Sequence, residues 1–225
     1  YSHTLTPLTS LWLSDLQTLK KQCHTLSQMG MASPFSILGT TLLLLFLSFS
    51  AAAIKAQDDI VRSSCVHASY PKLCLQTLST CSDHACKTPR DLAQAAVKVS
   101  LSRARRLSSY LAQVPTTGAN KRQQAALRDC AEQISDTVDD LSKTLSELKH
   151  LGRRGEEFQW QMSNAQTWVS AALTNEDTCL DGIPYVDDKK IKSDVRRKIK
   201  NVAKVTSNAL YMINRLDESR SRRDP

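Results

Sequence analysis

Cysteines are the residues of this sequence whose chemistry is most readily predicted. The chain has 225 residues and seven cysteines. Cys65 and Cys74 are nine residues apart with Pro71 between them, which suits a bridge across a bent helical hairpin. A bridge from Cys130 to Cys179 would close a loop of about 50 residues and contribute about 3–4.5 kcal/mol in the chain-entropy model. Spacing alone leaves the pairing open.

Cys81-Ser-Asp-His84-Ala-Cys86 is a segment that could hold a metal ion. Two thiolates and an imidazole are three of the usual ligands of zinc. No fourth ligand is nearby, and secretion would oxidise the thiols. We therefore expect a local or mixed disulfide, or two thiols in a loop, and we predict no metal and no other cofactor.

Catalytic motifs are absent from the sequence. His67, His84 and His150 share no recognisable motif with a nucleophilic Ser or Cys, and there is no G-x-S-x-G, H-E-x-x-H or phosphate-binding glycine loop. Asp139 and Asp140 lie outside the apolar stripe of their segment, and we interpret them as a solvated helix face. A binding protein is a better prediction than an enzyme.

The apolar run at residues 37–49 predicts a signal peptide. It is too short to span a bilayer, which needs ~20 residues, and it has the length of an h-region. Alanines follow it, so cleavage is expected after Ala53 or Ala56; a signal anchor or a buried helix is the alternative. With a translation start at Met31, the chain divides into an upstream extension at 1–30, a signal peptide at 31–56 and a mature domain at 57–225.

Composition agrees with secretion of a helical domain. Residues 57–225 keep six cysteines and a formal charge of +6, against +8 for the whole chain. An even set of cysteines can pair fully in an oxidising compartment. Six glycines, seven prolines and 5% aromatic residues are too few for a β-sandwich or barrel, and 41% apolar residues argue against generic disorder.

Four segments with helical periodicity must position the residues above. Their connections are short, which predicts an all-α, up-down-up-down four-helix bundle, with a helical hairpin at 58–80 broken at Tyr70-Pro71. The third segment is expected to end near Asp177, so that Cys179 lies just past it. The predicted stripes are Leu92, Ala96, Val99, Leu107 and Leu111; Leu127, Cys130, Ile134, Val138, Leu141, Leu145 and Leu148; Trp160, Asn164, Trp168, Ala171 and Ala172; and Ile191, Val195, Ile199, Val202, Thr206, Ala209, Ile213 and Leu216.

Basic residues gather in the fourth segment between Lys189 and Lys200. Ile191, Val195 and Ile199 recur through this run, which predicts an amphipathic helix with a basic outer face. In a secreted protein, such a face suits an acidic polysaccharide or an acidic partner better than nucleic acid. Simple solvation is the alternative.

Four sequence segments together carry a resemblance to a known family. They are SCVHASYPKLC at 64–74, ALRDC at 126–130, QTWVSAALTNEDTCLDG at 166–182 and VTSNAL at 205–210. They resemble the plant invertase/pectin methylesterase inhibitor domain, over residues of about 58–217. The resemblance implies a four-helix bundle with an N-terminal hairpin, disulfides Cys65–Cys74 and Cys130–Cys179, and a secreted, apoplastic protein of the cell wall.

The resemblance also implies an inhibitor that does no chemistry itself. The segment from Gln166 to Gly182 looks more like the pectin methylesterase branch, in which a 1:1 complex covers the pectin-binding cleft of the enzyme. Invertase inhibitors of the family use a Pro-Lys-Phe segment, which Pro71-Lys72-Leu73 does not match, so inhibition of acid invertase is the alternative. No catalytic domain follows Pro225, so a free-standing inhibitor is expected. A non-inhibitory, pectin-binding wall module is the alternative of another class.

Family contacts, carried over by position, fall near Cys130 and Cys179. The expected partner is pectin methylesterase, or acid invertase in the alternative, with no nucleic acid, no membrane after signal cleavage and at most weak contact with acidic pectin. Thr178 is the firmest candidate, as a hydroxyl beside a disulfide, with helix or loop capping as its alternative role. The candidate interface residues are Thr178, Asp181, Glu132, Gln133 and Asp136.

Overall fold

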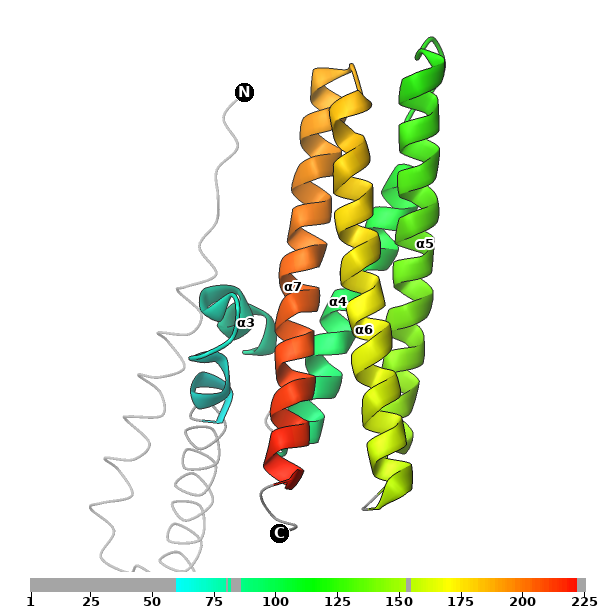
Figure 1. Ribbon diagram of the computed structural model, residues 1–225. Helices are drawn as coiled ribbons and strands as arrows, with labels where there is room; N and C mark the ends of the chain where they lie inside the picture. Colours follow the sequence, from blue (N-terminus) through cyan, green and yellow to red (C-terminus); the bar gives the residue numbers. More distant parts are fainter. Residues whose placement is uncertain (1–59, 80, 82–85, 153–154, 222–225) are drawn as a thin grey trace, which may run out of the picture. The chain divides into compact units, whose positions relative to one another are not determined.

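A computed structural model describes residues 60–79, 81, 86–152 and 155–221 of the chain (Figure 1). The expected upstream extension and signal peptide lie outside these residues. The described residues form helices and no strand, which confirms the prediction of an all-α fold. The elements are α3 (Pro71–Leu78), α4 (Pro89–Leu111), α5 (Lys121–His150), α6 (Glu156–Gly182), the 3-10 helix η1 (Ile183–Tyr185) and α7 (Lys189–Ser221).

Local sequence signals account for where the long helices begin. Thr88 and Asp91 form a capping box at the start of α4, in which the Asp91 carboxylate accepts from Thr88 N–H at 2.9 Å and the Thr88 hydroxyl accepts from Asp91 N–H. The side chain of Asn120 caps α5 by accepting from Gln123 N–H at 2.8 Å. Gly155 precedes α6 with a φ of +81°, a conformation that glycine adopts without strain.

The four long helices α4–α7 pack around a shared core, each against the helices before and after it, and α7 also packs against α4. Neighbours run in opposite directions, because residues near the start of one helix contact residues near the end of the next. The contacts that show this are Arg90 with Leu148, Cys130 with Cys179, Gln166 with Asp217, and Tyr110 with Lys198.

The apolar stripes of α4, α5 and α7 are largely those predicted from sequence. All eight predicted residues of α7 are buried except Ile191, which is half-buried. The stripe predicted for α6 is wrong except at Ala172, which is buried. Trp160 is 69% exposed, and Asn164, Trp168 and Ala171 are only half-buried. The buried face of α6 instead recurs at alternating steps of four and three residues: Phe158, Met162, Ala165, Val169, Ala172, Glu176 and Cys179.

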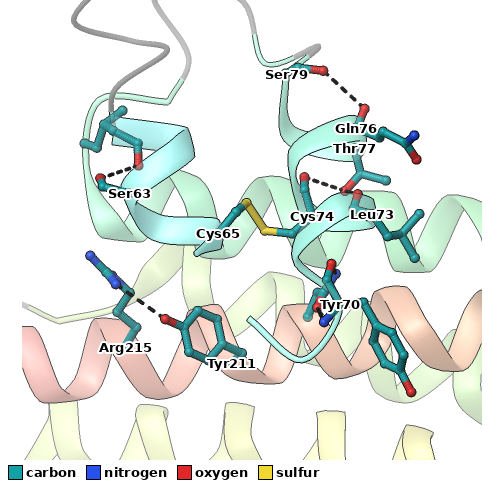
Figure 2. Close-up of a disulfide and its surroundings, with 12 residues drawn as sticks. Ser63, Cys65, Tyr70, Leu73, Cys74, Gln76, Thr77, Ser79, Tyr211 and Arg215 are labelled. Carbon is teal, nitrogen blue, oxygen red and sulfur yellow. Dashed lines mark hydrogen bonds between the residues drawn. A yellow bond between two sulfur atoms is a disulfide. The ribbon is translucent and has the colours of Figure 1, made fainter. Parts of the chain in front are cut away.

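The N-terminal hairpin bends at Tyr70, as predicted. Residues 60–65 are helical, a turn follows, and α3 begins at Pro71. Cys65 and Cys74 are joined across the bend, with 5.6 Å between their Cα atoms (Figure 2). Asn208 of α7, which is 3% exposed, accepts from Tyr70 N–H at 2.9 Å and donates to Tyr70 C=O at 3.1 Å. The bend is therefore fixed both by a covalent bond and by a side-chain amide from the bundle.

Candidate functional site

The Cys130–Cys179 disulfide links α5 to α6 and anchors the candidate interface. The two Cα atoms are 4.3 Å apart, and both side chains are 1% exposed. This is the pairing that the family resemblance implies. Cys179 lies inside α6, however, and not past its end as predicted.

The polar stretch that suggested the end of this helix is compatible with helical structure. The hydroxyl of Thr174 donates to Ser170 C=O at 3.2 Å, and that of Thr178 donates to Thr174 C=O at 2.8 Å. Both hydroxyls therefore satisfy their hydrogen bonding within the helix. No glycine or proline occurs in the helix before Gly182, so nothing in the backbone stops it earlier.

Two polar contacts continue the line of the disulfide between the helices. The hydroxyl of Thr137 is 3.4 Å from Ala172 C=O, and the side-chain amide of Asn175 donates to Asp140 at 3.3 Å. We call this line the α5–α6 seam. It is defined by Cys130, Thr137 and Asp140 on α5 and by Ala172, Asn175 and Cys179 on α6.

Three of the five predicted interface residues border the α5–α6 seam. At 3.6 residues per turn, Gln133 and Asp136 lie on the side of α5 that also carries Asp140, and Thr178 lies on the side of α6 that faces α5. Thr178 and Asp136 are exposed, and Gln133 is half-buried. Because Thr178 bonds to Thr174 within the helix, it does not cap a helix end, and its oxygen keeps acceptor capacity for a partner.

The other two predicted residues point away from the α5–α6 seam. Glu132 and Asp181 are exposed. Each lies about half a turn from the disulfide cysteine of its own helix. The structure therefore does not bring them together with Thr178.

The expectation that Asp140 is part of a solvated face is wrong. It is half-buried and contacts both Asn175 and Lys143, the latter at 3.5 Å. Burial raises the pKa of its carboxyl, and the Lys143 ammonium opposes that rise. Asp139, the neighbouring residue, is exposed as expected.

Glu176 is a second buried carboxyl that the sequence interpretation missed. It is fully buried between α6 and α7, one turn before Cys179, and Thr206 Oγ1 lies 2.8 Å from its Oε1. Its Oε2 has no hydrogen-bond partner. Burial raises the pKa of Glu176 to about 8. Extending the Ala165, Val169, Ala172 pattern by steps of four and three would have found it.

Cys81 and Cys86, for which metal binding was weighed against a disulfide, are joined to each other. Cys81 and Cys86 form a disulfide with 6.0 Å between their Cα atoms, so their sulfurs are not thiolate ligands. His84 lies outside the described residues. Where the chain is described, no group of three or more His, Cys, Asp or Glu side chains could hold a metal ion, and no helix is long and apolar enough to cross a membrane.

The fold defines a class: an all-α, disulfide-linked bundle of antiparallel helices. The chain belongs to the plant invertase/pectin methylesterase inhibitor family, whose model matches residues 59–212. Pectinesterase inhibitor 3 of Arabidopsis thaliana is 56% identical over 169 residues, which cover 73% of this chain and 82% of that protein. Pectinesterase inhibitor 9 of the same plant is 41% identical over 177 residues, which cover 75% of this chain and 85% of that protein.

A solved structure agrees with the fold. The crystal structure of a mutant form of a pectin methylesterase inhibitor from Arabidopsis superposes with a TM-score of 0.54 at 23% identity, over 67% of this chain and 92% of that one. At the level of the family the activity is inhibition, and the two relatives described above are named as inhibitors of pectinesterase.

Proposed function

We propose that this chain is a secreted, non-catalytic inhibitor of pectin methylesterase that acts in the cell wall. It binds the enzyme 1:1 and covers the pectin-binding cleft, so that the polymer cannot enter. The observation that carries the proposal is the α5–α6 seam, where Thr178, Gln133 and Asp136 border a buried disulfide in a chain of this family.

The seam suits binding because its backbone is already ordered. Both helices are continuous through the seam and are covalently joined at Cys130–Cys179. Binding then does not carry the additional cost of ordering a loop. Residues 129–140 of α5 contain five carboxylates and no cation, so a target surface with positive charge would be favoured.

The function is tested by titrating pectin methylesterase with the oxidised protein. We expect activity to fall to a baseline at an equimolar ratio, and light scattering of the mixture to give the mass of a 1:1 complex. Sucrose hydrolysis by acid invertase is measured in parallel. Unchanged pectin methylesterase activity from acidic to neutral pH would reject the proposal, and loss of invertase activity alone would favour the alternative target.

The position of the interface is tested by comparing the two groups of predicted residues. Thr178→Arg places a bulky cation at the seam without changing the buried face, and we expect inhibition at least about tenfold weaker, the cost of about 1.4 kcal/mol. Asp181→Arg, a matched change three residues along the same helix, should alter inhibition less than about twofold. If Asp181→Arg weakens inhibition as much as Thr178→Arg, the interface is not centred on the seam.

A further inference from the structure

Charge is segregated between the helices of the bundle. Residues 98–106 of α4 contain four cations and no acid, and residues 189–204 of α7 contain eight cations against the single acid Asp194. Residues 129–140 of α5 are acidic instead. Since α4 packs directly against α7, the two basic helices form one continuous cationic face.

This basic face contains a groove between the two helices. The groove has a volume of about 380 Å³ and places Leu107 and Val202 between its basic residues. Its polar lining is Arg103, Arg106, Arg197, Lys198 and Asn201. An apolar floor with cationic walls is a different surface from a uniformly solvated helix face.

Several groove cations are held in place by the fold. Arg103 donates to the Asn201 side-chain oxygen at 2.7 Å. The Lys198 ammonium lies 4.5 Å from the centre of the Tyr110 ring. Burial, followed by repulsion from Arg106, lowers the pKa of Arg103. These cations are therefore positioned close together at an electrostatic cost, which a bound anion would relieve.

Most of the positive charge in the groove is not neutralised by the protein itself. Arg197 is paired, with Asp194 at 2.8 Å. No ion pair within the described part of the chain involves Arg103, Arg106 or Lys198.

A second groove extends the first toward the hairpin. It has a volume of about 570 Å³, and its lining includes Tyr70, Lys72 and Lys204. Asn201 lines both grooves, so they meet at this residue. The Lys204 ammonium lies 5.4 Å from the centre of the Tyr70 ring. We call the combined feature the basic track, defined by Arg103, Arg106, Arg197, Lys198, Asn201 and Lys204.

We propose that the basic track is a binding site for an acidic polysaccharide, namely a stretch of de-esterified pectin (polygalacturonate). An extended row of cations matches a polymer that carries a carboxylate on every sugar, whereas a single small anion would occupy one part of the track. The choice of this polymer rests on the proposed function, because hydrolysis of pectin methyl esters exposes these carboxylates.

The location of the track has a consequence for inhibition. The track lies between α4 and α7, whereas the candidate interface borders the α5–α6 seam on the other pair of helices. One molecule can therefore hold de-esterified pectin and pectin methylesterase at the same time. The protein would concentrate where the enzyme has already acted.

The test compares polygalacturonate binding by two variants with equal charge changes. The track variant carries Arg106→Gln, Lys198→Gln and Lys204→Gln; the control carries Lys121→Gln, Arg128→Gln and Lys149→Gln, all three on α5. Binding is measured by affinity electrophoresis and calorimetry at low salt. We expect the track variant to bind about tenfold more weakly, the control less than about twofold, and wild-type binding to fall as salt rises.

Three further measurements decide whether the basic track binds polygalacturonate specifically: binding of esterified pectin, competition with duplex DNA, and inhibition by the track variant. Highly methyl-esterified pectin should bind at least about tenfold more weakly than polygalacturonate, because it lacks the carboxylates. Equal losses in the two variants, equal binding of the esterified polymer, or displacement by duplex DNA at equal charge concentration would each overturn the proposal. If the triple variant fails to fold, the exposed pair Arg106→Gln and Lys204→Gln replaces it. Inhibition by the track variant should equal that of wild type, so failure of the track and failure of the inhibitor function are distinguishable.

Discussion

Replacing Glu176 with glutamine should remove much of the pH dependence of the stability of this bundle. Glu176 is fully buried, and burial raises its pKa to about 8, with a smaller contribution from neighbouring Asp177 and opposition from Thr206. The folded protein therefore keeps the carboxyl protonated at neutral pH. The Thr206 hydroxyl, which lies 2.8 Å from Glu176 Oε1, donates to that oxygen and so favours the charged form, but burial outweighs this bond.

The sign and size of the effect follow from proton linkage. The pKa of Glu176 is 4.5 in the unfolded chain and about 8 in the folded protein. At a pH between these two values, the folded state binds one proton that the unfolded state does not, so the free energy of unfolding falls as pH rises. The slope is about 1.4 kcal/mol per pH unit. The contribution of this proton to the free energy of unfolding is complete below pH 4.5 and is lost by pH 8. It amounts to about 5 kcal/mol in total. A typical domain is stable by only about 5–15 kcal/mol.

Urea unfolding followed by circular dichroism from pH 4 to 9 measures the effect. From pH 5 to 7, the free energy of unfolding of wild type should fall by about 3 kcal/mol relative to Glu176→Gln. Glu132→Gln, at an exposed glutamate of α5, is the matched control and should track wild type at every pH. Parallel curves for wild type and Glu176→Gln would refute the reasoning, because they would mean that Glu176 binds no extra proton on folding.

The remaining predictions concern the two points where the fold is tied together, and the interface. Replacing Cys130 and Cys179 together by serine opens a loop with a sequence separation of 49, which should cost about 4 kcal/mol and lower Tm by roughly 10 °C; an unchanged Tm would contradict the role of this bridge. Asn208→Ala leaves the Tyr70 N–H and C=O without their partner and should cost about 2 kcal/mol in urea unfolding, whereas Asn214→Ala, at an exposed position of α7, should cost under about 0.5 kcal/mol. Thr178→Arg should weaken inhibition at least about tenfold while leaving Tm within a few degrees of wild type.

The architecture could be predicted from the sequence because the helical periodicity is strong and its breaks are chemically distinct. In α5 the predicted stripe is apolar throughout, and in the stripe of α7 Thr206 is the single polar residue. Asn120 and Gly155 mark helix starts. In α6 the large side chains misled the prediction. Trp160 drew the stripe to the wrong side of the helix, and Glu176 was passed over because a carboxylate is rarely buried, although the pattern of Ala165, Val169 and Ala172 reaches it at the next step of four.

The candidate site was predictable only to the level of the helices that form it. The resemblance located Cys130 and Cys179, but which neighbours share a face with them depends on the rotation and length of α6. Once α6 is known to continue to Gly182, Thr178 faces α5 and Asp181 does not. Asp140 was missed because its partner Asn175 lies 35 residues away in the sequence.

The way Asn208 holds the hairpin also bears on how this surface can vary among related proteins. Its amide bonds only to the main-chain N–H and C=O of residue 70, so docking of the hairpin does not depend on which side chain stands there. The exception is proline, which lacks the N–H. Position 70 can therefore change freely, and with it the aromatic ring near Lys204, while the backbone of the hairpin stays in the same place. Selection, or an engineer, can alter what this end of the bundle recognises without altering how the protein folds.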